Sequence, residues 1–331
     1  MKKTMVLFIG LLLFMGCDDG DLTASDVINL DSATLVKCNL NNIIYKINGD
    51  QALILEIADI ATAFKNKEET KALINIDITA NKLIFRTYNG EVKASNICAT
   101  TPEFYPTPKE EWIAQSGVIE IKTIVRKSEP NTTTNATKII GYRHLIFLRN
   151  INWLKPDGTT QQENFDRSFG VILTNPSYSL PFGFEDSPLV FKSPCPDDNT
   201  IIAKSGSESM RLKLDDTTYN YLFTTATTLP NTPKIRALTA NNKLTYNLFN
   251  GLVVLTDFCT PLPATRPATL EDWKANISTA STNGIIEVET TTETTTSVKH
   301  TIWLRSIIFD NGNVNFYYGD RIKFGFLIQN I

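Results

Sequence analysis

The stretch NGEVKASNICATTPEFYPTPKEEW (residues 89–112) carries landmarks that occur a second time in NGLVVLTDFCTPLPATRPATLEDW (residues 250–273). Three pairs of landmarks share an offset of 161 residues: Gly90 and Gly251, Cys98 and Cys259, Trp112 and Trp273. A constant offset between unlike landmarks indicates an internal repeat. The chain is therefore expected to contain two copies of one module, copy one at residues 33–175 and copy two at residues 195–331.

Both copies show the alternation of apolar and polar residues that is typical of strands. It is clearest at Ile74, Ile76 and Ile78 in copy one and at Met210, Leu212 and Leu214 in copy two. Such alternation buries one face of a strand. Many short strands between turn signals predict a mainly β fold of two tandem β-sandwich-like modules, with a barrel as the alternative.

One short helix is expected in each copy, immediately before the repeated tryptophan. Residues 107–110 place Thr at a capping position, then Pro, then Glu three residues after the cap. Residues 269–272 also begin with Thr, and Asp272 stands three residues after it. The acidic residues at both places, Glu110, Glu111, Glu271 and Asp272, are interpreted as first-turn residues that favour the helix dipole.

The connector between the copies, residues 176–194, contains four prolines and four aromatic residues. The aromatic residues are Tyr178, Phe182, Phe184 and Phe191. Disordered linkers are poor in aromatic residues. We therefore expect the connector to pack on one or both modules.

Four of the five cysteines divide evenly between the copies. The duplication selects the pairs Cys38–Cys98 and Cys195–Cys259, because each module then closes on itself. In the chain-entropy model each bond would contribute about 4 kcal/mol. The alternative, a zinc site, lacks a CxxC motif, and the two histidines are far apart in the sequence. No metal site is predicted.

The remaining cysteine, Cys17, follows a basic start at Lys2 and Lys3 and an apolar run too short to span a bilayer. This is the pattern of a secretory signal peptide, residues 1–16. Phe14-Met15-Gly16-Cys17 resembles the lipobox of bacterial lipoproteins. The resemblance implies cleavage before Cys17, lipid on its sulfur and a tether at residues 17–32. The alternative is an ordinary signal peptide with a chance cysteine.

Asp18-Asp19, directly after the cysteine, resembles the export signal of Bacteroidota surface lipoproteins. The resemblance implies an outer-membrane protein that faces the cell surface and is held to the membrane by its lipid. In enterobacterial sorting an aspartate there would instead imply inner-membrane retention. A location at the periplasmic face remains the alternative.

The charge balance limits the possible partners. Loss of Lys2 and Lys3 leaves 30 basic residues against 35 acidic ones, a net charge of −5. A net negative charge argues against nucleic acid and against an anionic lipid surface as partners.

His144 and His300 fall at matching places and are the candidate ligand or general-base residues. Each shares a strand face with two aliphatic residues, so the structural alternative is a core histidine with a hydrogen bond. No cysteine, serine or acid lies at a catalytic spacing from either. Arg149 and Arg305 also match, on the opposite face.

These arginines are expected to pair with two carboxylates at equivalent strand positions, Glu120 and Glu287. All four tryptophans have aromatic counterparts: Trp112 with Trp273, Trp153 with Phe309, and Trp303 with Phe147. Exchange of Trp for Phe favours core packing over a sugar-stacking platform.

The leading functional hypothesis is a lipid-anchored binding or adhesion protein without catalytic activity or cofactor, whose partner is a glycan or a protein. Two modules on a short tether suit avidity. The tandem layout is loosely similar to surface glycan-binding lipoproteins of Bacteroidota. The alternatives are a structural subunit of an envelope assembly, which would expose a strand edge or an apolar patch, and, less favoured, a hydrolase.

Overall fold

The structure is a computed structural model that describes residues 28, 30–101, 103–182, 184, 189–223, 232–277 and 283–331. The signal peptide, Cys17 and Asp18-Asp19 lie outside the described residues. None of the helices within the described ranges has the length and apolarity needed to span a bilayer.

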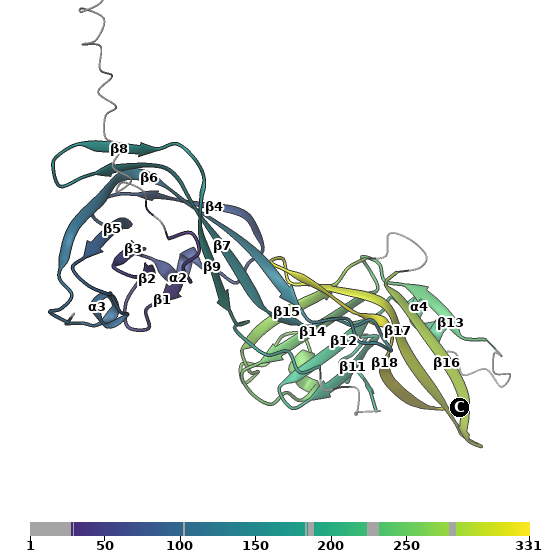
Figure 1. Cartoon of the computed structure of the whole chain (residues 1–331). Helices are drawn as coiled ribbons and strands as arrows, with labels where there is room; N and C mark the ends of the chain where they lie inside the picture. Colours follow the sequence, from purple (N-terminus) through teal and green to yellow (C-terminus); the bar gives the residue numbers. More distant parts are fainter. Residues whose placement is uncertain are drawn as a thin grey trace, which may run out of the picture. The chain divides into compact units, whose positions relative to one another are not determined.

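Copy one forms a nine-stranded sheet in the order β1-β2-β3-β5-β6-β7-β8, with β4 paired to β6 and β9 paired to β7 (Figure 1). Its strands are β1 Val36–Lys37, β2 Ile43–Asn48, β3 Gln51–Glu56, β4 Glu69–Ile76, β5 Lys82–Tyr88, β6 Pro108–Lys127, β7 Ile139–Leu154, β8 Thr160–Glu163 and β9 Arg167–Thr174.

Copy two forms the corresponding sheet in the order β10-β11-β12-β14-β15-β17-β16-β13, with β18 paired to β17. Its strands are β10 Phe191–Lys192, β11 Thr200–Ser205, β12 Glu208–Lys213, β13 Lys234–Ala237, β14 Lys243–Phe249, β15 Thr269–Ala275, β16 Ile285–Thr294, β17 Ser297–Asp310 and β18 Asn315–Asn330. Two tandem, mainly β modules are thus confirmed.

The repeated landmarks have the same local structure in both copies. The main-chain N–H of Asn89 donates to Thr107 O at 3.0 Å, and that of Asn250 donates to Ala268 O at 3.0 Å. Each asparagine side chain accepts the return bond from the same partner. A β-bulge lies at the last two residues of β5 and of β14, directly before the asparagine. An asparagine at the end of the strand therefore closes the equivalent loop in each copy.

The helices expected at residues 107–110 and 269–272 are wrong, because these segments begin strands β6 and β15. Trp112 pairs with Phe85 across the sheet, and Trp273 with Tyr246. A short capped segment is marginal as a helix by itself, and proline is tolerated at the first residue of a strand. Pairing with the neighbouring strand and burial of the tryptophan therefore override the capping signal.

Short helices lie elsewhere in each copy. The equivalent helices α2 Ile60–Ala63 and α4 Asp216–Leu222 are capped by Asp59 and Asp215, whose side chains accept from the second residue after the helix start. The cysteine-bearing segments contain α3 Ser95–Cys98 and the 3-10 helix η3 Leu255–Phe258. Neither pair showed a strong apolar period in the sequence.

Both expected disulfides are present. Cys38 bonds Cys98 and Cys195 bonds Cys259, each with 5.4 Å between the Cα atoms. Each bond ties the segment before the first long strand to the turn after β5 or β14. Cys38 is itself part of a small apolar cluster with Tyr45, Ile54 and Tyr88.

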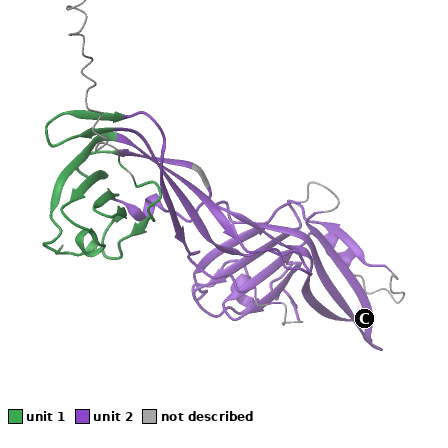
Figure 2. Cartoon of the chain, in the orientation of Figure 1, with its two compact units in different colours: residues 1–56, 76–116, 152–162 green, residues 57–75, 117–151, 163–331 purple. Residues whose placement is uncertain are grey.

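The chain divides into two compact units that differ from the two copies (Figure 2). The first unit holds residues 1–56, 76–116 and 152–162, and the second holds residues 57–75, 117–151 and 163–331. The long strands β6 and β7 contribute residues to both. The second unit therefore combines all of copy two with part of copy one and the connector.

Within the second unit the β6–β7 hairpin tip of copy one bonds to β18 of copy two. Thr137 N–H donates to Tyr317 O at 2.8 Å, and Asp320 N–H donates to Thr134 O at 2.8 Å. The Asn135 amide donates to the Asp320 carboxylate at 2.6 Å. The side chains of Thr132 and Thr133 are exposed, as expected for a polar hairpin tip, but the main chain of Thr134 and Thr137 is bonded to β18.

Candidate ligand-binding site

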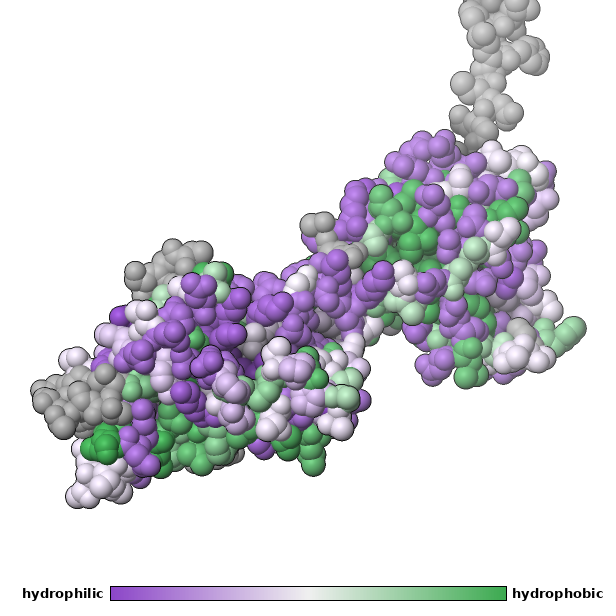
Figure 3. Space-filling view, turned by 180° about the vertical axis from the view of Figure 1, so that it is seen from behind, coloured by the Kyte–Doolittle hydropathy of each residue, from purple (hydrophilic) through white to green (hydrophobic). Residues whose placement is uncertain are grey.

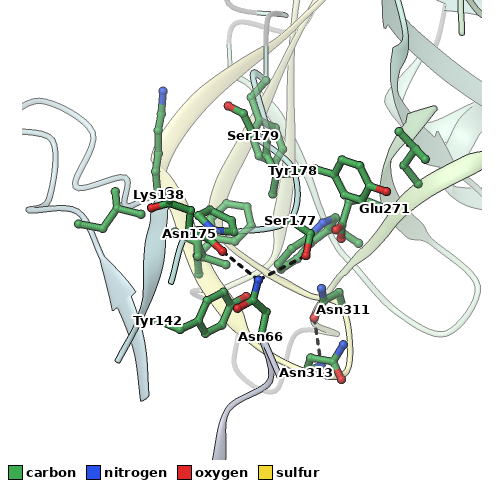
Figure 4. A pocket seen from close by; sticks show the side chains of 18 of the residues that line it. Asn66, Lys138, Tyr142, Asn175, Ser177, Tyr178, Ser179, Glu271, Asn311 and Asn313 are labelled. Atoms are coloured by element: carbon green, nitrogen blue, oxygen red, sulfur yellow. Dashed lines mark hydrogen bonds between the residues drawn. The ribbon is translucent and has the colours of Figure 1, made fainter. Parts of the chain in front are cut away.

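A cleft of about 830 Å³ lies within the second unit (Figure 4). Its walls come from five segments that are far apart in the sequence: Asn66 after α2, the start of β7, the connector after β9, β15, and the turn between β17 and β18. The lining combines amides, hydroxyls and two carboxylates with aromatic rings. This mixture is typical of sites that bind small polar molecules in a fixed orientation.

Asn66 is the centre of the polar wall. Its amide nitrogen donates to Asn175 O at 2.9 Å and lies 3.3 Å from the Ser177 hydroxyl. Its amide oxygen accepts from the Thr174 hydroxyl at 3.0 Å. Figure 4 shows the Asn66 side chain with its bonds to Asn175 and Ser177 on one side of the cleft. The amide orientation of Asn66 is therefore fixed on both atoms.

Behind this wall the hydrogen bonds continue to the buried His144. The Thr174 hydroxyl lies 3.0 Å from His144 Nε2, and Thr123 Oγ1 lies 2.9 Å from Nδ1. Because the Thr174 hydroxyl donates to Asn66, it must accept from Nε2–H, so Nδ1 accepts from Thr123. Burial lowers the pKa of His144 to about 4, which keeps it neutral near pH 7. The imidazole thus orients Asn66 through Thr174 but does not itself line the cleft.

His300 has the same surroundings in copy two, with one difference. Thr290 Oγ1 lies 2.9 Å from its Nδ1, and the Phe223 ring packs edge-on at 5.3 Å. The ring of Phe64 packs on His144 at 5.2 Å in the same way. Burial lowers the pKa of His300 to about 4 as well. In the strand register Gln329 takes the place of Thr174, so the connection to a cleft asparagine is specific to copy one.

Of the two acidic residues that line the cleft, Glu271 and Asp272 on β15, Glu271 has the shifted pKa. Burial raises its pKa, while hydrogen bonds from the side chains of Asn311 and Trp273 oppose this rise. The nearby Tyr142 has its pKa raised by burial and then by the charge of Glu271. Glu271 is the counterpart of Glu110 at the repeat offset, which accepts from the Trp112 indole at 2.7 Å. The position therefore interacts with the repeated tryptophan in both copies, and in copy two it also lines the cleft.

Aromatic rings supply the apolar part of the cleft. Tyr178, on the connector, is 41% exposed. Deeper in, Phe182 stacks on Tyr246 at 4.1 Å and contacts Phe316 at 5.5 Å. The expectation that the connector packs on a module is confirmed for Phe182 and Phe184, both buried. Tyr178 remains available to a ligand.

The other predicted site residues lie away from the cleft. Arg149 pairs with Glu120 at 2.9 Å, and Arg305 pairs with Glu287 at 3.0 Å, as the strand positions predicted. Among the described residues no group of three or more His, Cys, Asp or Glu is placed to hold a metal ion. Trp112, Trp153 and Trp273 are buried in the core.

Comparisons with family models, curated proteins and solved structures found no match for this chain. The cleft itself was not visible in the sequence, because its polar residues come from turns with no shared motif: Asn66, Asn175, Ser177, Asn311 and Asn313. The usable signals were the aromatic connector, which contains Tyr178, and the repeat offset, which relates Glu271 to Glu110.

Proposed function

We propose that this chain is a lipid-anchored binding protein of the cell envelope, and that its cleft binds a glycan. The observation that supports this proposal most directly is the Asn66 amide, whose nitrogen and oxygen are both hydrogen-bonded. The exposed ring of Tyr178 lines the same cleft. A sugar presents hydroxyls, which donate and accept hydrogen bonds, and apolar C–H faces, which pack on aromatic rings. Amides and carboxylates can hydrogen-bond the hydroxyls, and a tyrosine ring can pack on the C–H faces.

Preorganisation supports binding by this cleft. The Asn66 orientation is set by Thr174 and, through it, by a neutral histidine. Groups that are already oriented lose less conformational entropy when a ligand binds. The activity proposed for the cleft is recognition, and the two acidic residues that line it, Glu271 and Asp272, are neighbours on one strand. No catalytic step is part of the proposal.

The location rests on the N-terminal sequence. Cys17 would carry the lipid, and Asp18-Asp19 would direct the protein to the cell surface. Protease treatment of intact and lysed cells tests this. Loss of the protein from intact cells supports surface exposure, whereas protection until lysis would place it on the periplasmic face.

Titration calorimetry against a panel of soluble neutral polysaccharides tests the cleft. At least one should bind the intact chain, and Tyr178→Ala should weaken binding about tenfold because the stacking surface is removed. Asn66→Ala should have an effect of similar size, since it removes the oriented amide. Absence of binding to any glycan would contradict the proposal.

Tyr221→Ala is the matched control. Tyr221 is 39% exposed, close to the 41% of Tyr178, and it lies on α4 in the same unit but outside the cleft. Its replacement should leave glycan affinity unchanged. An equal loss in both variants would place the binding elsewhere.

A role as a structural subunit of an envelope assembly is the second candidate, favoured by exposed apolar residues on the free faces of β4 and β9. Leu73 and Leu173 are 57% and 58% exposed. Figure 3 shows apolar side chains reaching the surface in several separate patches on one face of the molecule. Apolar surface of this kind is a feature of interaction sites. Crosslinking in cells to one envelope protein, lost in Leu173→Ser, together with no glycan binding, would favour this candidate.

A further inference from the structure

The outer face of β16, β17 and β18 carries aromatic and charged side chains that the cleft does not use. His300, Ile302 and Leu304 point into the core, so the residues between them point outward. Along this face the register brings the following residues together: Glu287, Glu289, Lys299, Thr301, Trp303 and Lys323, with Arg305, Arg321 and Phe326 beside them.

One end of this face is neutralised and rigid. Glu287, whose side chain is only 7% exposed, accepts from Arg305 at 3.0 Å and from Arg321 at 2.7 Å. Arg321 also pairs with Glu289, and its guanidinium lies 3.8 Å from the centre of the Trp303 ring. Two arginines against two carboxylates leave no net charge here. The half-buried indole is held in one place by the cation that stacks on it.

The other end carries two positive charges that are not neutralised. Lys299 Nζ lies 4.4 Å and Lys323 Nζ 5.8 Å from the centre of the Phe326 ring. Neither ammonium has a carboxylate partner among the residues that the structure describes. The strand edge is fixed at this point, since Val190 N–H donates to Phe326 O at 3.0 Å. Two lysines therefore flank one aromatic ring on a rigid strand pair.

The corresponding face of copy one has a different chemistry. Where Trp303 pairs with Lys323 in copy two, Phe147 pairs with Ser168, and where Thr301 pairs with Phe326, Leu145 pairs with Val171. The buried faces of the same strands keep histidine, isoleucine and leucine in both copies. Copy one keeps a positive charge at Arg143 and a ring at Phe147, the places of Lys299 and Trp303, but has Ser168 and Val171 at the places of Lys323 and Phe326. The full set of two lysines and two rings therefore occurs in copy two.

We propose that the face formed by Lys299, Trp303, Lys323 and Phe326 is a second binding site, for an acidic glycan. Sugar rings would pack on the exposed parts of the two aromatic rings, and a carboxylate or sulfate would lie between the two ammonium groups. Thr301 and Glu289 offer a hydroxyl and a carboxylate to sugar hydroxyls.

This site goes beyond the cleft, because it selects for charge and does not depend on Asn66 or Tyr178. Titration of the full chain with polygalacturonate and with heparin tests it, and fully methyl-esterified polygalacturonate is the neutral control. Binding of at least one acidic polymer, weakened about tenfold or more in the double variant Lys299→Gln/Lys323→Gln, is the expected result at low salt. Tyr178→Ala should leave this binding unchanged.

The matched control is Lys213→Gln/Lys243→Gln, which removes two exposed lysines that face each other across β12 and β14. It should retain the acidic glycan affinity of the parent chain. Equal losses in the two double variants would show non-specific charge attraction and overturn the proposal, as would no binding to either acidic polymer. The proposal would also be overturned if a single-stranded oligonucleotide bound as tightly as the acidic glycan and lost this binding in Lys299→Gln/Lys323→Gln.

Discussion

The β6–β7 hairpin tip of copy one and the β16–β17 tip of copy two occupy the same place in the repeat but differ in what they contact. In copy one, residues 128–138 separate the strands, and the tip bonds to Tyr317 and Asp320. In copy two only residues 295 and 296 separate the strands. The short tip bonds within its own hairpin and to the C-terminal Ile331, and residues 291–296 are exposed.

This difference separates two classes of residue in a duplicated chain. Elements that stabilise a module from within, such as the disulfide and the buried histidine, occur in both copies. Elements that contact the neighbouring copy occur only where a neighbour exists. Paired substitutions at equivalent positions can therefore test the comparison, with equal effects expected for the first class and unequal effects for the second.

Removal of either disulfide should have the largest effect, and an equal one. The closed loops span 60 and 64 residues. In the chain-entropy model Cys38→Ser/Cys98→Ser and Cys195→Ser/Cys259→Ser should each lower the free energy of unfolding by about 4 kcal/mol. Urea denaturation of the three proteins measures this. A loss confined to one copy would show that the two bonds do not serve equivalent modules.

The buried histidines should make the next largest contribution, as a dependence of stability on pH. Their native pKa of about 4 lies below the unfolded value of about 6.5. Between these values the unfolded chain binds a proton that the native chain does not, so stability falls as the pH falls. Each histidine should contribute roughly 3 kcal/mol over this window, fully retained above pH 6.5 and lost by pH 4.

Thermal unfolding from pH 7 to pH 4 measures this in the parent chain and in His144→Gln, His300→Gln and the double variant. The two single variants should reduce the pH dependence equally. Only His144→Gln should also weaken glycan binding at pH 7, because Thr174 then loses the partner that orients Asn66. An unchanged pH dependence in the double variant would exclude both histidines as its source.

The hairpin tips should give the smallest and most unequal effect. Thr137 Oγ1 lies 3.3 Å from Tyr317 O and 3.2 Å from its main-chain nitrogen. Thr137→Val should lower the free energy of unfolding by about 1 kcal/mol, since it removes these bonds. Thr296→Val, at the exposed tip of copy two, should change it by less than about 0.5 kcal/mol. Equal effects would mean that the contact with β18 contributes nothing to stability.

The repeat offset predicted much of the fold, because pairs of equivalent residues constrain each other. It predicted both disulfides and the pairing of Arg149 and Arg305 with their carboxylates. The mainly β class was predicted separately, from the alternation of apolar and polar residues and the turn signals. The sequence prediction failed at residues 107–110 and 269–272, where a local capping pattern was interpreted as a helix. Local propensity is a weak prior when strand pairing and burial of a tryptophan favour another conformation.

The cleft could not be predicted, because its residues share no spacing. Asn66, Tyr178 and Asn313 follow three different elements and Glu271 lies on a fourth, and only the fold brings them to one surface. The interaction between the Thr-rich tip and β18 was equally hidden. Turns that contact solvent and turns that contact another part of the chain use the same polar residue types, so the sequence does not distinguish them.

The sequence by itself determined most of the residues that each module needs to close its own core: the cysteines, the inward histidines and the alternating residues Met210, Leu212 and Leu214 of copy two. In copy one the alternation ends with β4 at Ile76, and Ile78 is 57% exposed. The signal of the core residues is local or repeated, so it can be read along the chain. The tertiary structure decided where copy one bonds to copy two and where a cleft forms. These contacts join segments as much as 185 residues apart, such as Asn135 and Asp320, and each depends on the path of the chain between its partners.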